Sequence, residues 1–180
     1  MSLSDAEYAV LRQTIAARGT ARMVLLPVTV IGWGAIILVI LLFSAVPLAS
    51  LVSLGVLAAG FEAIHALHVG VGRIGRYIQV YYESGSDTPR WETTAMAVGP
   101  SLPGGGIDPL FSALFICAAL VNLTAGLLTR PAPVELAVGG LLHLAFIFRV
   151  VRSRGAAARQ RAVELESYRA LRLRDNDPVR

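Results

Sequence analysis

Residues 46–69 read VPLASLVSLGVLAAGFEAIHALHV, and this stretch decides the fold. It is apolar over a length that meets the roughly 17–25 residues a helix needs to cross a bilayer. It also carries one carboxylate, Glu62, and two histidines, His65 and His68. A charged residue at the centre of a membrane helix costs about 2.5–3.5 kcal/mol on insertion scales. We therefore expect a transmembrane helix whose polar residues pair with one another or serve a function.

Three further segments have the same length and character, namely residues 23–43, 109–128 and 132–151. Very short connections follow the first and third segments, which predicts two antiparallel hairpins. The chain has 180 residues, 55% of them apolar, and a mean hydropathy of +0.64. The sequence therefore predicts an all-α integral membrane protein, with a four-helix bundle of two transmembrane hairpins over residues 23–151.

The segments on either side of this bundle are expected to be amphipathic helices in the cytoplasm. Residues 1–22 begin with a capping-box pattern at positions 4–7. Apolar side chains then recur on one helical face at Tyr8, Leu11 and Ile15. Gly19 is expected to end this surface helix before the first span. Residues 152–180 predict a basic helix that follows the fourth span.

The second span has no clear stop signal, so its helix is expected to continue over residues 70–83 into the cytoplasm. Gly70–Gly75 matches the dinucleotide-binding pattern G-x-G-x-x-G, but that motif works between a strand and a helix. We instead interpret these glycines as a bend or a close helix contact. Residues 84–108 are expected to form a long loop with a short helical turn at 91–98. Asp108 is expected to cap the third span.

The distribution of arginine orients the chain. All 16 basic residues are arginine, and only Arg130 lies in a connection opposite the termini. Because cytoplasmic segments carry the excess of basic residues, both termini are predicted to be cytoplasmic and the protein to lie in the inner (cytoplasmic) membrane. The arginine-rich C-terminal segment is expected to meet anionic lipid headgroups of the bilayer. No recognition motif accompanies the charge, so no nucleic-acid partner is expected.

The sequence shows no complete catalytic set. Cys117 is the single cysteine, which excludes chemistry that needs a cysteine pair within one chain. The chain has no lysine, which excludes a Schiff base on that side chain. No nucleophile is recognisably paired with a base. An enzymatic function is therefore not favoured.

The candidate functional residues are the ionisable groups of the second and fourth spans, Glu62, His65, His68, His143 and Arg149. With the span centres near residues 57 and 142, Glu62 lies about 7 Å toward the cytoplasm and Arg149 lies at a similar depth. The simplest interpretation is a buried Glu62–Arg149 or Glu62–His65 pair that fixes how the spans pack. A polar ridge is expected to continue along the second helix through Arg73, Arg76 and Glu83.

Other uses of this cluster are open. The Glu-x-x-His spacing places two ligands one turn apart, which allows a metal site of Glu62, His65 and His143. Haem b needs two histidines at nearly equal depth, whereas His143 lies about 10 Å or more from His65 along the membrane normal. No cofactor is predicted, with a metal ion and haem b as the alternatives.

The preferred function is a non-enzymatic structural or accessory subunit of a membrane assembly or homo-oligomer. Small residues in the second and fourth spans favour close helix packing, within the chain or with other membrane subunits. The alternative is a transporter or channel protomer in which Glu62, His65 and His143 bind a proton or an ion. A metal- or haem-bearing membrane redox protein is less favoured.

Overall fold

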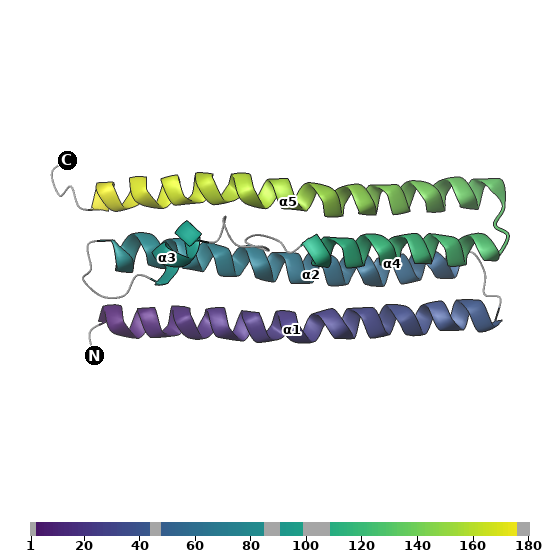
Figure 1. Ribbon diagram of the computed structural model, residues 1–180, viewed down its shortest axis with the longest axis horizontal. Helices are drawn as coiled ribbons and strands as arrows, with labels where there is room; N and C mark the ends of the chain where they lie inside the picture. Colours follow the sequence, from purple (N-terminus) through teal and green to yellow (C-terminus); the bar gives the residue numbers. More distant parts are fainter. Residues whose placement is uncertain (1–2, 44–47, 85–90, 99–108, 176–180) are drawn as a thin grey trace. The chain divides into compact units, whose positions relative to one another are not determined.

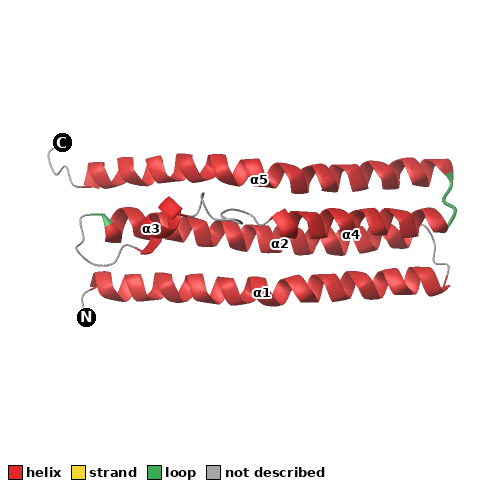
Figure 2. Cartoon of the chain, viewed as in Figure 1, coloured by secondary structure: helices red, strands yellow, loops and turns green. Residues whose placement is uncertain are grey.

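The structure is a computed structural model that describes residues 3–43, 48–84, 91–98 and 109–175. These residues form helices without any strand, which confirms the all-α prediction (Figures 1 and 2). In chain order the elements are α1 (Leu3–Phe43), α2 (Leu48–Ile78), the π-helical turn η1 (Gln79–Glu83), α3 (Trp91–Val98), α4 (Pro109–Leu128) and α5 (Pro133–Asp175).

Four of these helices, α1, α2, α4 and α5, are long and apolar enough to cross a membrane. α1 contains the predicted span 23–43, and α4 coincides with the predicted span 109–128. α2 begins at Leu48 and α5 at Pro133, so they cover the predicted spans 46–69 and 132–151 from these residues onward. The connection between α4 and α5 is short, as predicted, and Arg130 adopts a positive φ of 54° there. The amide of Arg130 donates to the carbonyl oxygen of Leu127 at 3.1 Å. This bond ends α4 with a tight turn.

The predicted end of the first helix at Gly19 is wrong, because α1 continues without interruption from Leu3 to Phe43. A glycine inside a helix costs only about 1 kcal/mol relative to alanine. Ending the helix there would leave four carbonyl groups without intrahelical partners next to an apolar segment. The predicted extension of the second helix to Glu83 is confirmed, as is the helix at 91–98. Asp108 and its predicted cap lie outside the described residues.

The chain divides into two compact units. The first unit comprises Met1–Ala21, Ala66–Gly106 and Arg154–Arg180, and the second unit comprises Arg22–His65 and Ile107–Ser153. The second unit holds the apolar parts of α1, α2 and α5 together with α4, and Figure 1 shows these helix segments side by side. The first unit holds the more polar parts of α1, α2 and α5, with η1 and α3.

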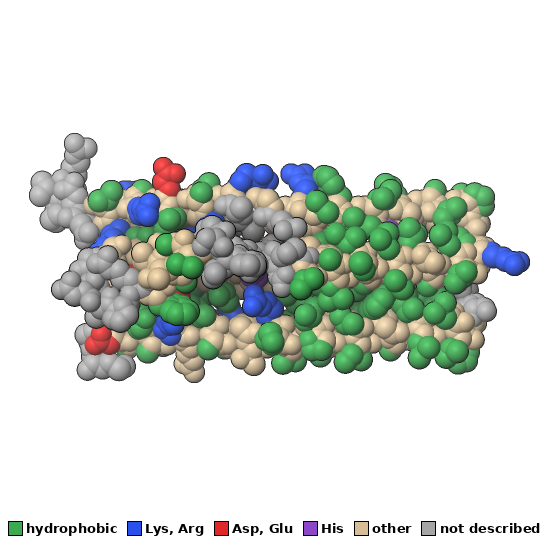
Figure 3. Space-filling view, in the orientation of Figure 1, with side chains coloured by type: hydrophobic (Ala, Val, Ile, Leu, Met, Phe, Trp, Pro, Cys, Tyr) green, Lys and Arg blue, Asp and Glu red, His purple; other side chains and the backbone are tan. Residues whose placement is uncertain are grey.

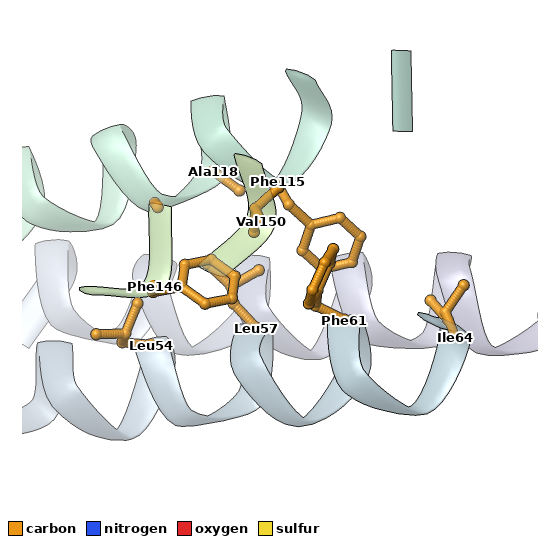
Figure 4. Packing of buried hydrophobic residues seen from close by; sticks show 9 residues of the cluster. Leu54, Leu57, Phe61, Ile64, Phe115, Ala118, Phe146 and Val150 are labelled. Atoms are coloured by element: carbon orange, nitrogen blue, oxygen red, sulfur yellow. The ribbon is translucent and has the colours of Figure 1, made fainter. Parts of the chain in front are cut away.

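The core of the second unit is centred on Phe61, which is fully buried. Its ring centroid lies 5.3 Å from that of Phe115 and 6.0 Å from that of Phe146 (Figure 4). The Phe111 centroid lies 5.8 Å away. Aromatic pairs at such separations are stabilising beyond the area they bury. Leu54, Leu57 and Val150 fill the space beside these rings. This core therefore joins α2, α4 and α5.

The first unit contains a cluster of tyrosine rings. All five tyrosines of the chain lie in this unit, whereas all six phenylalanines lie in the second. The Tyr77 ring contacts the rings of Tyr81, Tyr82 and Tyr168, and Tyr82 also contacts Tyr8 at 5.4 Å between centroids. The Tyr77 hydroxyl donates to the carboxylate of Glu7 at 3.0 Å. These contacts join α1, α2 with η1, and α5.

Gly60 marks the close approach of α1 to α2, which yields a stability prediction. A Cβ added to Gly60 would lie 2.8 Å from the Cβ of Thr29 and closer still to its Cγ2 and Oγ1. The Thr29 hydroxyl donates to Leu25 O at 2.8 Å, so its side chain cannot turn aside without losing that bond. We expect Gly60→Ala to lower the free energy of unfolding in detergent by about 1–3 kcal/mol.

The matched control is Gly55→Ala in the same helix, because a Cβ at Gly55 meets no atom within 4 Å. Thermal unfolding of both variants checks the helix contact. Equal stability of the two variants would show that α1 and α2 do not meet at Gly60.

Candidate functional site

Of the two pairs that the sequence suggests, Glu62–Arg149 and Glu62–His65, the structure contains an ion pair between Glu62 and Arg149. Arg149 Nη2 donates to Glu62 Oε2 at 2.7 Å, which joins α2 to α5. The side chains keep exposed fractions of 44% for Arg149 and 49% for Glu62. The pair therefore lies on the surface of the second unit rather than deep within its core.

The side chains of His65 and Arg149 both contact the ring of Phe61. The guanidinium carbon of Arg149 lies 5.7 Å from the Phe61 centroid, within the range of a cation–π contact. The His65 ring lies 5.7 Å from the Phe61 ring, with only 4° between the two planes. Within the described part of the chain, the buried Nδ1 of His65 has no hydrogen-bond partner. Glu62, His65 and Arg149 therefore surround one aromatic side chain.

His143 belongs to a different polar group and is almost fully buried. Its Nδ1 lies 2.7 Å from the carbonyl oxygen of Gly139, and its Nε2 lies 2.8 Å from Asn122 Nδ2. Because a carbonyl oxygen only accepts, the network assigns the ring proton to Nδ1. Nε2 then accepts a hydrogen bond from Asn122, which also donates to Ser50 O at 2.8 Å. The histidine is thus held in one tautomer.

Asn122 is the residue of this group that the sequence reasoning missed. It is fully buried on α4, and its amide joins the backbone of α2 to the His143 side chain of α5. Hydrogen bonds between membrane helices average about 0.6 kcal/mol each, with larger values near 1.7 kcal/mol. The available signal was that Asn122 is the only asparagine or glutamine in the four predicted spans.

The structure does not bring Glu62, His65 and His143 into one site. Among the residues it describes, no three His, Cys, Asp or Glu side chains are grouped to hold a metal ion. His143 precedes Arg149 by six residues, which is about 9 Å along α5, and both of its ring nitrogens are engaged. His68 lies in the first unit. The metal and haem b alternatives stay predictions.

Arg73 and Arg76 of the polar ridge bind one carboxylate. Two nitrogens of Arg73 donate to Glu164 Oε1 at 3.1 and 3.0 Å, and Arg76 Nε donates to Glu164 Oε2 at 3.0 Å. Arg76 Nη2 also pairs with Glu164 Oε2. The Arg76 side chain is only 6% exposed, so this is a buried anchor between α2 and α5.

Glu83, the third residue of the ridge, binds the N-terminus of α3 instead of the Glu164 carboxylate's arginine partners. Its buried carboxylate accepts hydrogen bonds from the amides of Glu92 and Thr93 at 2.8 and 2.7 Å. A carboxylate at this position caps the first turn of α3. Its negative charge also interacts favourably with the partial positive charge at the N-terminus of the helix. Glu92 in turn pairs with Arg12 at 2.7 Å. Burial raises the pKa of the Glu92 carboxyl, although the charge of Arg12 acts in the opposite direction.

Arg172 caps the other end of this region. Its guanidinium donates to the carbonyl oxygens of Val80 and Ser84, the latter at 3.1 Å. The last carbonyls of a helix lack intrahelical partners, and a positive charge there is favourable. The ridge residues and Arg172 therefore hold the helices of the first unit together.

The second unit also contains a cavity of about 190 Å³ beside the turn between α4 and α5. Its walls are mainly aliphatic, and Ser50 and His143 supply polar groups. Glu135 lines the cavity too, but its carboxylate accepts the amide of Ala132 at 2.8 Å and so caps the start of α5. The cavity suits an apolar occupant better than an ion.

No family model, curated protein or solved structure matches this chain. The function therefore has to be argued from the geometry of the two units.

The Asn122 network yields a prediction on helix packing. We expect Asn122→Ala to lower the free energy of unfolding by about 1–3 kcal/mol, because the buried His143 Nε2 loses its donor and the bond that links α4 to Ser50 O is lost. Thermal unfolding in detergent measures the effect. The control is Thr124→Ala, whose exposed hydroxyl bonds only within its own helix, to Leu120 O at 2.9 Å. An Asn122→Ala protein as stable as this control contradicts the network.

The Glu164 anchor yields a prediction on pH. Burial alone would raise the pKa of the Glu164 carboxyl, but hydrogen bonds from Arg76, Gln160 and Arg73 outweigh it and leave this pKa below its ordinary value. Because the pKa of Glu164 is lower in the folded state than in the unfolded state, its ion pairs stabilise the fold fully at pH values above the unfolded-state pKa. This stabilisation is lost as the pH falls through the lower, folded-state pKa of Glu164.

We therefore expect the first unit to melt at a lower temperature as the pH is reduced from about 5 to about 3. Near-ultraviolet circular dichroism of a Trp33→Phe protein reports mainly this unit, because Trp91 and every tyrosine lie in it. Glu164→Gln should remove a measurable part of that pH dependence. A variant with the same pH profile as the wild type would show that the anchor does not act on stability.

Proposed function

We propose that this chain is a multi-pass integral membrane protein that acts as a non-enzymatic structural or accessory subunit. The second unit crosses the bilayer, and the first unit forms a cytoplasmic body. Four helices with the length and composition of membrane spans support this assignment. The proposal treats the polar residues of the second unit as packing elements.

The exposed surface of the second unit supports its placement in lipid. Large hydrophobic side chains stand out from its helices, with exposed fractions of 70% at Ile31, 75% at Leu110 and 68% at Leu141. On the face drawn in Figure 3, hydrophobic side chains cover α4 and the first half of α5. Soluble monomers rarely expose apolar patches larger than a few hundred Å². Lipid chains are the natural cover for such a surface.

The contacts of Phe61 supply a depth for the ion pair. Its ring packs between Phe111 and Phe115, in the first two turns of α4. If the centre of α4 lies at the centre of the bilayer, Glu62 lies about 10 Å from that centre, by the helix rise. This is about 3 Å nearer the cytoplasmic surface than the span centres in the sequence suggested. The pair remains inside a hydrocarbon layer about 30 Å thick.

The observation that carries the proposal is the separation of the two polar groups. On α5, the buried side chain of Phe146 lies between His143 and Arg149. On α2, buried Leu54 and Leu57 lie between Ser50 and the ion-paired Glu62. A path for protons or ions needs a chain of polar groups or water, whereas the phenylalanine core interrupts it here. The geometry therefore favours a structural role over transport.

The transporter alternative rests on two observations. The cavity beside the α4–α5 turn reaches His143, and His65 Nδ1 is buried without a partner in the described ranges. A rearrangement of the Phe61 core would be needed to connect these two places.

The structural role predicts no conduction. We expect purified protein in liposomes to give no proton or ion flux above that of the Glu62→Gln variant, because the polar groups are not connected. A pH-sensitive dye inside the vesicles measures the flux. A wild-type flux that Glu62→Gln abolishes would establish the transporter alternative instead.

The membrane placement predicts a labelling pattern. In a Cys117→Ser background, an impermeant maleimide added to intact cells should label Arg130→Cys, because the α4–α5 turn faces outward. It should label Arg169→Cys only after lysis, because that exposed position of α5 faces the cytoplasm. Labelling of both positions in intact cells, or of neither after lysis, contradicts the arrangement.

A further inference from the structure

One face of α2 in the second unit stays uncovered by the described chain. We call it the Glu62 face, and it consists of Val52, Gly55, Ala59, Glu62 and Ala63, which are all exposed and recur at helical spacing. Val52 is 63% exposed. Arg149 of α5 extends the face through its 2.7 Å bond to Glu62.

This face carries an acidic residue, Glu62, and a basic residue, Arg149, on a surface that is proposed to face lipid. Glu62 and Arg149 keep about half of their side-chain surface exposed, and in the proposed placement they lie inside the hydrocarbon layer. Their mutual bond satisfies only part of their hydrogen-bonding capacity, since a carboxylate has about four acceptor sites and a guanidinium five donors. Charged residues at membrane depth normally find further polar partners on neighbouring helices.

We propose that the Glu62 face binds the same face of a second copy of this chain, around a two-fold axis parallel to the membrane normal. The proposal rests on the membrane placement argued above. Such an axis brings residues of equal depth together. The 2.7 Å bond between Glu62 and Arg149 shows that they share one depth, so Glu62 of one copy meets the partner's Arg149.

The charges favour a second copy over other occupants. An interface around a two-fold axis has to be complementary to itself. A face with one sign of charge repels its own copy, whereas an acid beside a base attracts it. In the dimer, four charges form a neutral ring in which each carboxylate contacts two guanidinium groups. An aliphatic lipid chain provides no partner for either charge.

The side chains beside Glu62 permit this approach. Ala59 and Ala63 are small, and a Cβ added at Gly55 would meet no atom within 4 Å of its own chain. Small residues let two membrane helices come close enough for van der Waals contact. The exposed face of α4 around Cys117 carries no charge and therefore offers no such pairing.

The decisive experiment exchanges charges between two copies that carry different tags. Glu62→Arg puts two positive charges on the face, and Arg149→Glu puts two negative charges there. Each variant alone should lose self-association in lipid nanodiscs. The two co-expressed should form mixed dimers at least tenfold more often than either forms dimers with itself. Because the bond within each chain is broken in both variants, only contact between copies explains recovery.

A second measurement leaves both charges native. In the Cys117→Ser background, Ala59→Cys should give a disulfide-linked dimer under mild oxidation in membranes, and a monomer under reducing conditions. The matched control is the unmodified chain, whose exposed Cys117 on α4 should not cross-link.

Several results would overturn the proposal. These are a wild-type protein that is monomeric in nanodiscs, cross-linking through Cys117 instead of Ala59→Cys, or co-expressed charge variants that do not associate. A mixed complex with a different protein at this face would also overturn it. Maleimide labelling of Arg130→Cys and Arg169→Cys tests the membrane placement separately. A chain that inserts as proposed but stays monomeric refutes the dimer and leaves the membrane placement intact.

Discussion

A helix that crosses lipid has to satisfy its backbone hydrogen bonds internally, because hydrocarbon offers no other partners. In the proposed placement this constraint applies to α4 and to the parts of α1, α2 and α5 in the second unit, which are helical throughout. Along the same helices the aromatic residues change with their surroundings. Phenylalanine forms the core of the second unit, whereas a tyrosine cluster lies in the first, where the Tyr77 hydroxyl donates a hydrogen bond to the carboxylate of Glu7.

Polar residues join helices in both units, but they do so in different ways. In the first unit the bonds are between charged groups, as in the two arginines that bind Glu164. In the second unit the buried bonds are between uncharged groups, as in Ser50, Asn122 and His143. Its ion pair between Glu62 and Arg149 lies at the surface. Burying an unpaired charge is costlier than burying a paired amide, which explains this division.

The sequence predicted the four apolar helices well, because span length leaves few alternatives. Matching depth suggested the Glu62–Arg149 pair, with Glu62–His65 as the alternative, but as a buried pair, whereas both side chains are about half exposed. It did not predict the Glu164 anchor. Arg76 and Glu164 are 88 residues apart, and no local pattern distinguishes Glu164 from the neighbouring Glu166. The predicted helix end at Gly19 is wrong because a single glycine rarely ends a helix when the segments on both sides of it favour helix. The prediction of one polar site for His143 and Glu62 used only the depth that the helix rise gives. Depth does not show which side chain a buried histidine contacts, and His143 in fact bonds to Asn122.

The proposed division of the chain into a lipid-embedded unit and an aqueous unit is tested most directly by its two tryptophans. Trp33 packs against both apolar clusters of the second unit, whereas Trp91 is 65% exposed on α3 in the first unit. The variants Trp33→Phe and Trp91→Phe each leave one fluorophore. In bilayers with bromine at the middle of the acyl chains, Trp33 should be quenched strongly and Trp91 should not, while acrylamide in the water should quench Trp91. Equal quenching of both tryptophans by the brominated chains would contradict this account.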